Sequence, residues 1–253
     1  MQGSQKAPSD DINKLKKYLK LLKSIINFIL PRKIINFLAF IYGYKFFKIS
    51  YSQFGEDLII LKYLQYKKIT KGIYLDIGAF HPRWISNTHL LHKLGFKGWC
   101  VDLDEEKLKY FKLARGNKVK TICASVSASK KKYLNFYKFK RKHQFSEIDT
   151  LSYEFANKIK KKWKINFEIK KIKNYYINDL FFKIGKINVL NIDVEGLDYK
   201  LIKHANFEII NPDIIIFEDA RNYFASKAII NFFNKMKYIL LFQSGPSKCF
   251  AKK

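Results

Sequence analysis

Cysteine is scarce in this sequence, and none of it is spaced for metal binding or disulfide bonding. Cys100, Cys123 and Cys249 are scattered over 253 residues, without a Cys-x-x-Cys pair. Zinc-binding motifs and small disulfide-rich folds both depend on closely spaced cysteines. The sequence therefore excludes these two classes, and we expect reduced, largely buried thiols in a cytoplasmic protein.

Acidic residues are few as well. The chain has 21 Asp and Glu against 49 Lys and Arg, a formal net charge of +28. Such an excess usually indicates nucleic acid, an anionic membrane or an acidic substrate. Here Lys is enriched together with Asn, Ile, Phe and Tyr along the whole chain, which indicates a general compositional bias. We therefore do not expect nucleic acid as the main partner, and a non-enzymatic nucleic-acid-binding protein is kept only as an alternative.

The N-terminal part lacks a long apolar run. Residues 1–11 are polar, which predicts a disordered tail without a cleavable secretory signal. Residues 12–49 carry apolar side chains at helical spacing, interrupted at Pro31, and predict a helical N-terminal extension. Its longest uncharged run, 34–44, is far shorter than the roughly 20 apolar residues of a membrane span. Lysines border the apolar stripe, so the extension either attaches peripherally to the inner face of the membrane, or packs on the next domain or across a homodimer.

Helical and strand-like segments alternate from residue 50 to residue 253. This alternation predicts an α/β domain of Rossmann-like type, with a mostly parallel sheet flanked by helices. The expected strands are 72–77, 98–102, 118–124, 187–192, 213–217 and 238–243, and the expected helices are 56–66, 87–94, 105–114 and 198–204. Residues 132–139 alternate in polarity and predict an additional strand.

Residues 141–173 are rich in Lys and aromatic side chains and fit no strand of the expected sheet. We interpret this segment as a basic insertion over the ligand-binding face. Its Lys and aromatic residues could grip a phosphorylated or nucleotide-linked ligand, or even stacked bases. A solvated helix with an apolar underside is the plainer interpretation.

The phosphate-binding loops of nucleotide-dependent proteins are absent. Neither G-x-G-x-x-G nor G-x-x-x-x-G-K-[ST] occurs, which counts against NAD and ATP. Instead, an apolar strand runs into Gly78, where a small molecule can approach the backbone closely. The next strand ends at Asp102, whose carboxylate can accept hydrogen bonds from both hydroxyls of a ribose, while Asp104 is expected to cap the following helix. A cofactor with a ribose and without phosphates fits this pattern.

The domain also carries an ordered series of short motifs. They are Ser52-Gln53-Phe54-Gly55-Glu56-Asp57, a strand with Asp76, Ser86-Asn87-Thr88, Ala124-Ser125, Ile192-Asp193-Val194-Glu195-Gly196 and Phe217-Glu218. Over residues 51–219 this series resembles that of the FkbM-family methyltransferases. The resemblance implies a Rossmann-like enzyme that binds S-adenosylmethionine (SAM) and often modifies hydroxyl groups in polysaccharide or secondary-metabolite pathways.

The resemblance also implies a set of cofactor-binding residues. They are Gln53, Glu56, Asp76, Gly78, Asp102, Ala124 and Ser125. Gln53 and Glu56 would lie near the methionine end of the cofactor, and Asp76 and Gly78 would form the loop after the first strand. Asp102 would hold the ribose, and Ala124-Ser125 would lie beside the adenine. The family often has Glu-Pro where this chain has Asp102-Leu103, but the shorter acid can still reach a ribose. Ser52 and the Ser86-Asn87-Thr88 triplet could instead, or in addition, cap helices.

Methyl transfer to a hydroxyl requires an aligned acceptor and a group that takes its proton. Asp193 and Glu195 follow an expected strand and share one face if the backbone stays extended, and Glu218 and Asp219 end the next strand. These acids could supply a general base with a raised pKa or bind Mg²⁺. Alternatively, Glu195 makes only local contacts. His81 is another candidate base. The catalytic candidates are Asp193, Glu195, His81 and Glu218, and the metal candidates are Asp193, Glu195, Glu218 and Asp219.

The predicted function is a SAM-dependent O-methyltransferase. Its acceptor would be a small sugar, a nucleotide sugar or another sugar-derived molecule, used in surface polysaccharide or glycoconjugate biosynthesis. An RNA ribose methyltransferase is the alternative that keeps the same fold. No Asn/Asp-Pro-Pro-Tyr loop is present, which disfavours methylation of amino groups.

Overall fold

The computed structural model describes residues 48–139, 146, 148–219 and 225–253, together with Lys17, Tyr18, Ile34 and Phe37. The predicted tail, nearly all of the predicted helical extension and residues 141–145 and 147 of the predicted insertion lie outside the described residues. The chain divides into two units, Met1–Ile49 and Ser50–Lys253, and all elements below belong to the second. No helix within the described ranges combines the length and apolarity needed to cross a membrane.

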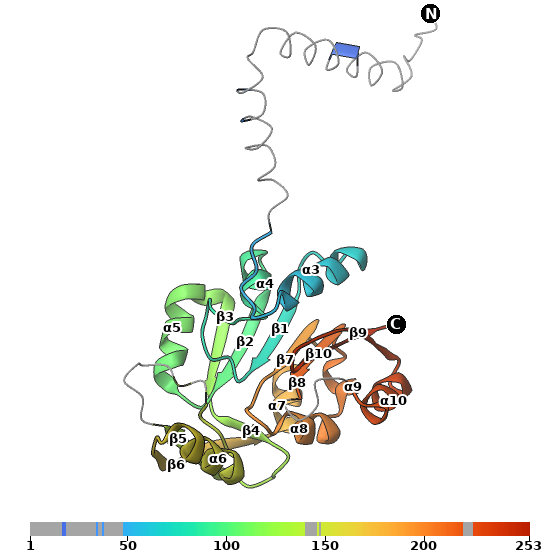
Figure 1. Cartoon of the computed structure of the whole chain (residues 1–253). Coiled ribbons are helices and arrows are strands. Elements are labelled where there is room, and N and C mark those ends of the chain that lie inside the picture. Colours follow the sequence, from blue (N-terminus) through green and yellow to red (C-terminus); the bar gives the residue numbers. More distant parts are fainter. Residues whose placement is uncertain are drawn as a thin grey trace, which may run out of the picture. The chain divides into compact units, whose positions relative to one another are not determined.

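A seven-stranded sheet forms the centre of the second unit, with strand order β3-β2-β1-β7-β8-β10-β9 (Figure 1). Its strands are β1 (Ile73–Ile77), β2 (Lys97–Asp102), β3 (Val119–Cys123), β7 (Val189–Ile192), β8 (Ile214–Glu218), β9 (Tyr238–Ser244) and β10 (Ser247–Lys252). The neighbours from β3 to β8 pair in parallel, whereas β10 is antiparallel to both β8 and β9. The predicted α/β class with a mostly parallel sheet is confirmed. The strand β10 was not predicted.

The middle of this sheet is buried on both faces, as the apolar strand β8 shows, whereas the edge strands β3 and β9 are partly exposed. In β8, Ile215 and Phe217 belong to one core cluster, while Ile214 and Ile216 belong to the other. Successive side chains of a strand point to opposite faces, so one run of isoleucines supplies both cores. Figure 1 shows the helices around the sheet, which are α3 (Glu56–Tyr66), α4 (His89–Lys93), α5 (Glu105–Arg115), α7 (Ile177–Ile184), α8 (Asp198–His204), α9 (Phe207–Ile210) and α10 (Lys227–Lys235). Of these, α7, α9 and α10 were not predicted.

The starts of two helices test the capping predictions. Asp104 precedes α5 and its side chain accepts a hydrogen bond from the Glu106 N–H at 3.0 Å, as predicted. Ser52 does not cap α3, because the helix begins after Gly55, which has a φ of 83°. The Ser52 hydroxyl instead exchanges hydrogen bonds with Asp57, accepting from its N–H at 3.2 Å and donating to its carboxylate at 3.0 Å. The motif therefore ties the chain before α3 to its first turn.

The predicted insertion contributes to a second, three-stranded sheet with order β4-β6-β5. Its strands are β4 (Ser125–Ser127), β5 (Tyr133–Phe139) and β6 (Phe167–Tyr176), and helix α6 spans Tyr153–Trp163. The additional strand expected at 132–139 is confirmed as β5. Ala156 and Ile159 of α6 pack against Phe139 and Ile148, while the lysines of its last turn are exposed. The helical part of the segment thus matches the interpretation as a solvated helix with an apolar underside, whereas the strand β6 was not predicted.

Of the three cysteines, Cys100 and Cys249 are buried and Cys123 is exposed. The expectation of buried thiols therefore fails at Cys123, which ends the edge strand β3 of the central sheet.

Candidate cofactor and active site

One pocket runs across the carboxyl edge of the parallel strands. It is lined by Ala124 after β3, Asp102 at the end of β2, Gly78 after β1, Asp193 after β7 and Glu218 at the end of β8. Ligands of open parallel sheets bind at this edge, because the loops that follow the strands open there. All seven residues that were predicted to bind the cofactor line this pocket.

Gly78 lies where two loops touch. Its φ is 80°, a conformation that residues with a side chain rarely adopt, and a Cβ built on it would lie 1.6 Å from the Asp193 carbonyl oxygen. The loop after β1 can therefore pass the loop after β7 only with a glycine here. This contact adds a packing reason to the one that the sequence suggested, which was access of a ligand to the backbone.

Asp76 lies at the floor of the pocket and is 2% exposed. Its carboxylate accepts hydrogen bonds from the Thr88 hydroxyl at 2.5 Å and from the Asn191 amide at 2.9 Å. Asn87 donates in turn to the Asn191 side-chain oxygen at 3.0 Å. Burial raises the pKa of Asp76, and the positive charge of Arg115 opposes that rise. Polar side chains thus satisfy a carboxylate that burial alone would disfavour.

Arg115 donates hydrogen bonds to the polar groups around Asp76. Its guanidinium donates to the Thr88 hydroxyl at 2.9 Å, to the Ser86 hydroxyl at 2.9 Å and to the Pro82 carbonyl at 2.7 and 3.0 Å. Thr88 is the N-cap residue of α4, as the capping interpretation of this triplet expected, but its side chain makes no capping bond to the helix and donates to Asp76 instead. Arg115 ends α5 and belongs to no motif in the sequence, and only the folded chain brings it beneath Asp76.

Asp102 is held by two backbone groups. Its carboxylate accepts from the Phe80 N–H at 3.0 Å and from the Asp104 N–H at 2.9 Å, and the Lys107 ammonium lies 3.6 Å away. The loops after β1 and β2 therefore fix its position. A carboxylate has about four acceptor positions, so capacity remains for the hydroxyls of a ribose.

Acidic side chains gather at the other end of the pocket. Glu56 is 1% exposed and accepts from the Phe54 N–H at 2.7 Å and from the Ser247 hydroxyl at 3.0 Å. Burial raises the pKa of Asp193 well above its usual range, and the negative charges of Glu218 and Glu195 raise it further. Burial also raises the pKa of Glu218. Desolvation and the repulsion between neighbouring carboxylates therefore both favour the protonated forms of these acids.

Asp198 joins the same group from the start of α8. Its carboxylate accepts from the Val194 N–H at 3.1 Å and so closes the loop that carries Asp193. Burial raises the pKa of Asp198 to about 7, against the opposing effect of that hydrogen bond. The residue was not singled out in the sequence, although its position five residues after Asp193 could have suggested it.

Three site predictions need correction, and Glu195 is the first. The backbone after β7 does not stay extended, since Glu195 has a φ of 50° and its carbonyl accepts from the Thr150 hydroxyl at 3.1 Å. Asp193 and Glu195 therefore line the pocket from a turn and not from one face of a strand.

The metal prediction is the second. No group of three or more His, Cys, Asp or Glu side chains in the described part of the chain is arranged to hold a metal ion. Asp219 does not line the pocket with Asp193, Glu195 and Glu218. The described residues therefore give the predicted Mg²⁺ site no support.

His81 is the third. It lies outside this pocket and borders a separate hollow with Trp84 and Tyr110. Its Nδ1 accepts from the Arg83 and Trp84 N–H groups at 3.1 and 2.9 Å, and its ring stacks on Trp84 at 4.3 Å. Phe80, with a φ of 51°, turns the chain just before it. The imidazole thus stabilises a turn, and the prediction of a catalytic base at this position is not supported.

The parallel sheet with an antiparallel last strand, and the pocket across its carboxyl edge, define a Rossmann-like α/β domain with a ligand site. A family model described as "Methyltransferase FkbM domain" matches residues 76–240, which is more than half of the chain. The protein therefore belongs to the FkbM methyltransferase family, as the motif series indicated. Gln53 and Glu56 lie before the matched residues.

Two solved structures are similar to the chain at low sequence identity. The chain is similar to a Pyrococcus horikoshii protein described as a "putative RNA methyltransferase", with 12% identity and a TM-score of 0.40 over 81% of this chain and 92% of that chain. It is also similar to a SAM-dependent methyltransferase from Agrobacterium tumefaciens, with 8% identity and a TM-score of 0.38 over 80% of this chain and 63% of that chain. No curated protein matches the chain in sequence.

Proposed function

We propose that the protein transfers the methyl group of SAM to a hydroxyl of a sugar or a sugar-derived acceptor, in surface polysaccharide or glycoconjugate biosynthesis. The observation that carries this proposal is the pairing, in one pocket, of a ribose-type acid at Asp102 with half-buried acids of raised pKa at Asp193 and Glu218. SAM supplies an electrophilic methyl group when it is bound. The remaining chemistry concerns where the acceptor lies and where its proton goes.

Asp193 is the proposed general base. Bound SAM would supply the methyl carbon and keep the electron pair of the carbon–sulfur bond that breaks, so the task left to the chain's own residues would be to accept the proton of the hydroxyl. The hydroxyl proton passes to the Asp193 carboxylate. A base works best when its pKa lies near the working pH, and burial with neighbouring acids raises the pKa of Asp193 from the usual range of a carboxyl. We expect turnover to rise with pH as the shared protons leave this group.

Asp193→Asn tests the role of the base. The change keeps the shape of the side chain but removes proton acceptance, so methyl transfer should fall by roughly 10²–10⁴-fold. Binding of S-adenosylhomocysteine should stay within a few-fold of wild type, because the ribose acid and the loop glycine are unchanged. Release of S-adenosylhomocysteine would be measured over a panel of sugars, nucleotide sugars and oligosaccharides. Asp219→Asn, outside the pocket, is the matched control, and equal turnover in the two variants would refute the assignment.

The basic region supports an anionic acceptor. Residues 130–173 hold 15 of the 49 Lys and Arg of the chain but only 4 of its 21 acids. Lys160, Lys161 and Lys162 are exposed on α6, and Thr150, just before that helix, contacts the Glu195 carbonyl at the pocket. A phosphate-linked sugar would place its charge near these lysines. Methylation of an RNA ribose is the second candidate, favoured by the same lysines.

Salt dependence separates the two acceptors. Single-stranded RNA neutralises several lysines at once, so its affinity should fall steeply with salt, whereas a nucleotide sugar carries few charges and should respond weakly.

The predicted extension at 12–49 would add peripheral attachment to the inner face of the membrane or formation of a homodimer. Vesicle flotation and light scattering, each with and without residues 1–49, test those two proposals.

A further inference from the structure

The small sheet β4-β6-β5 has one face that helix α6 covers only in part. In the antiparallel pair of β5 and β6, Phe139 lies opposite Phe167, and α6 packs on these two rings. Side chains at alternate positions and directly opposite one another share a face, which places Tyr133, Ile169 and Lys173 on the same side. Tyr133 and Ile169 are 47% and 60% exposed, so this part of the face is open to solvent.

Lysines surround two tyrosines of this open part. Each tyrosine ring has two lysine ammonium groups between 5.1 and 5.9 Å from its centre, within the range of cation–π attraction. Lys173 lies opposite Tyr133 and directly before the pair of Asn174 and Tyr175, so the two groups form one continuous row. We call this row the basic strip, and its members are Lys132, Tyr133, Lys171, Lys173, Tyr175 and Lys183.

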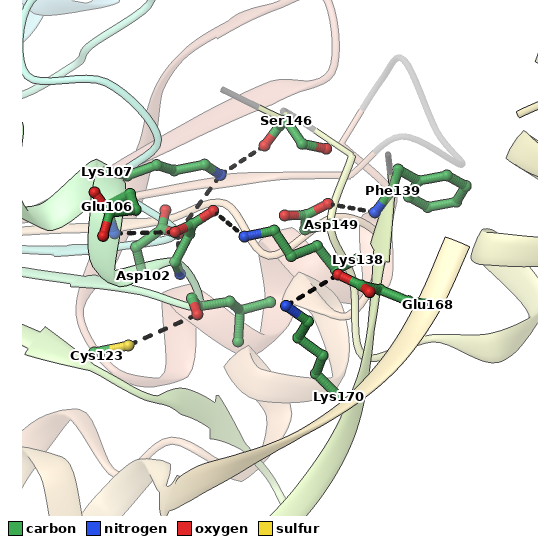
Figure 2. Close-up of polar contacts among 12 residues, drawn as sticks. Asp102, Glu106, Lys107, Cys123, Lys138, Phe139, Ser146, Asp149, Glu168 and Lys170 are labelled. Carbon is green, nitrogen blue, oxygen red and sulfur yellow. Dashed lines mark hydrogen bonds and ion pairs between the residues drawn. The ribbon is translucent and has the colours of Figure 1, made fainter. Parts of the chain in front are cut away.

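The positive charges of the basic strip are not neutralised within the described part of the chain. Its lysines are exposed, and none of them forms an ion pair with a described carboxylate. On the opposite face of the sheet, Lys138 contacts Asp104 at 2.6 Å. Lys170 contacts Glu168 at 3.0 Å on that face as well, and Figure 2 shows this pair. Uncompensated charge of one sign therefore gathers on the open face, and it favours an anionic partner.

Two features of the basic strip favour a bilayer with anionic lipids over a nucleic acid. Bases of single-stranded nucleic acids stack on open aromatic faces, whereas lysines lie over both tyrosine rings. Ile169, on the same face, offers exposed apolar surface that nucleic-acid phosphates do not use. At a bilayer surface, tyrosines lie at the level of the headgroups, lysines reach the lipid phosphates and apolar side chains enter the boundary of the acyl chains.

We propose that the basic strip docks the unit Ser50–Lys253 on an anionic lipid surface. Its lysines contact the lipid phosphates, and Tyr133 and Ile169 lie at the level of the headgroups. The strip belongs to the unit that carries the cofactor pocket, so it acts in addition to the attachment proposed for residues 12–49. The inference holds for either of the two proposed acceptors.

Sedimentation with lipid vesicles tests this proposal on the full-length protein. The vesicles contain either phosphatidylcholine alone or an equal mixture of phosphatidylcholine and phosphatidylglycerol, which carries a negative charge. We expect binding to the mixed vesicles that weakens as the salt concentration rises, and little binding to the neutral vesicles.

A quadruple variant removes the charge of the strip by replacement with Gln of Lys132, Lys171, Lys173 and Lys183. A lysine near an anionic surface strengthens binding about fivefold, so this variant should bind the mixed vesicles roughly 100-fold more weakly than wild type. The matched control makes the same change of net charge at exposed lysines outside the small sheet, which are Lys67, Lys71, Lys97 and Lys118. Its binding should stay within about threefold of wild type, because charges far from the bilayer are screened.

Ile169→Ser separates a lipid surface from a simple polyanion. Loss of the apolar side chain should weaken binding to the mixed vesicles by roughly fivefold, while binding of a single-stranded oligouridylate should not change. The side chain is exposed, so the fold should be retained, and circular dichroism checks this for each variant.

Every outcome bears on the proposal. If the wild-type protein does not sediment with the mixed vesicles, or if the quadruple variant binds them as tightly as the matched control, the proposal is overturned. If the strip binds the oligouridylate and wild type does not bind the vesicles, the partner is a nucleic acid and the lipid surface is equally overturned. A loss confined to the quadruple variant and Ile169→Ser supports docking through the basic strip.

Discussion

Replacement of Arg115 by methionine would test how the pocket floor is held. The guanidinium is 3% exposed and donates to the Tyr74, Thr88 and Ser86 hydroxyls and to the Pro82 carbonyl. Methionine can fill part of the volume and keep contact with the neighbouring rings, but it provides no donor. The variant would leave four buried oxygens with fewer partners and remove the positive charge that opposes the rise in the pKa of Asp76.

The cost should be large. Removing one partner of a buried, charged network destabilises a protein by roughly 3–5 kcal/mol, and we expect a loss in that range for Arg115→Met. Arg115→Lys keeps the charge but not the forked geometry, so it should recover only part of the stability. Urea denaturation followed by circular dichroism gives the free energy of unfolding, and calorimetry gives the affinity for S-adenosylhomocysteine. A loss below about 1 kcal/mol with unchanged affinity would refute the role of Arg115.

Three further predictions follow from the same site. Gly78→Ala should abolish ligand binding, because its Cβ would meet the Asp193 carbonyl. Gly185→Ala, with a φ of 77°, a ψ of −160° and no atom within 4 Å, should cost only its backbone strain, about 1–3 kcal/mol in a thermal melt. Asp198 has a folded pKa of about 7, above its unfolded value, so its contribution to stability is complete below about pH 4 and is lost as the pH rises to 7. Asp198→Asn should flatten that decline in urea titrations between pH 4 and 8, and a decline equal to that of wild type would contradict the pKa. The Asp102→Ala variant should no longer bind S-adenosylhomocysteine in calorimetry. If it keeps micromolar affinity, which corresponds to a binding free energy of about 8 kcal/mol, the ribose role is ruled out.

The sequence determined the central sheet and the class of the protein. Buried parallel strands must be continuous apolar runs, so β1, β7 and β8 could be predicted from the sequence alone. Residues that directly follow such strands reach the same edge of the sheet, which is why Asp102 and Asp193 could be placed in one pocket. The cap at Asp104 could also be predicted, because capping of a helix depends only on the local sequence.

Only the tertiary structure decided which side chains meet within that pocket. Arg115 contacts Thr88 and Pro82 across about thirty positions of sequence, and Asp149 lines the same pocket as Asp102 from the segment between β5 and α6. His81 leaves the pocket because the backbone reverses at a residue with a positive φ. Such turns set the direction of every following side chain, and no periodicity in the sequence marks them. Local pattern therefore places the strands, while the loops that follow them, fixed by long-range contacts, determine the site.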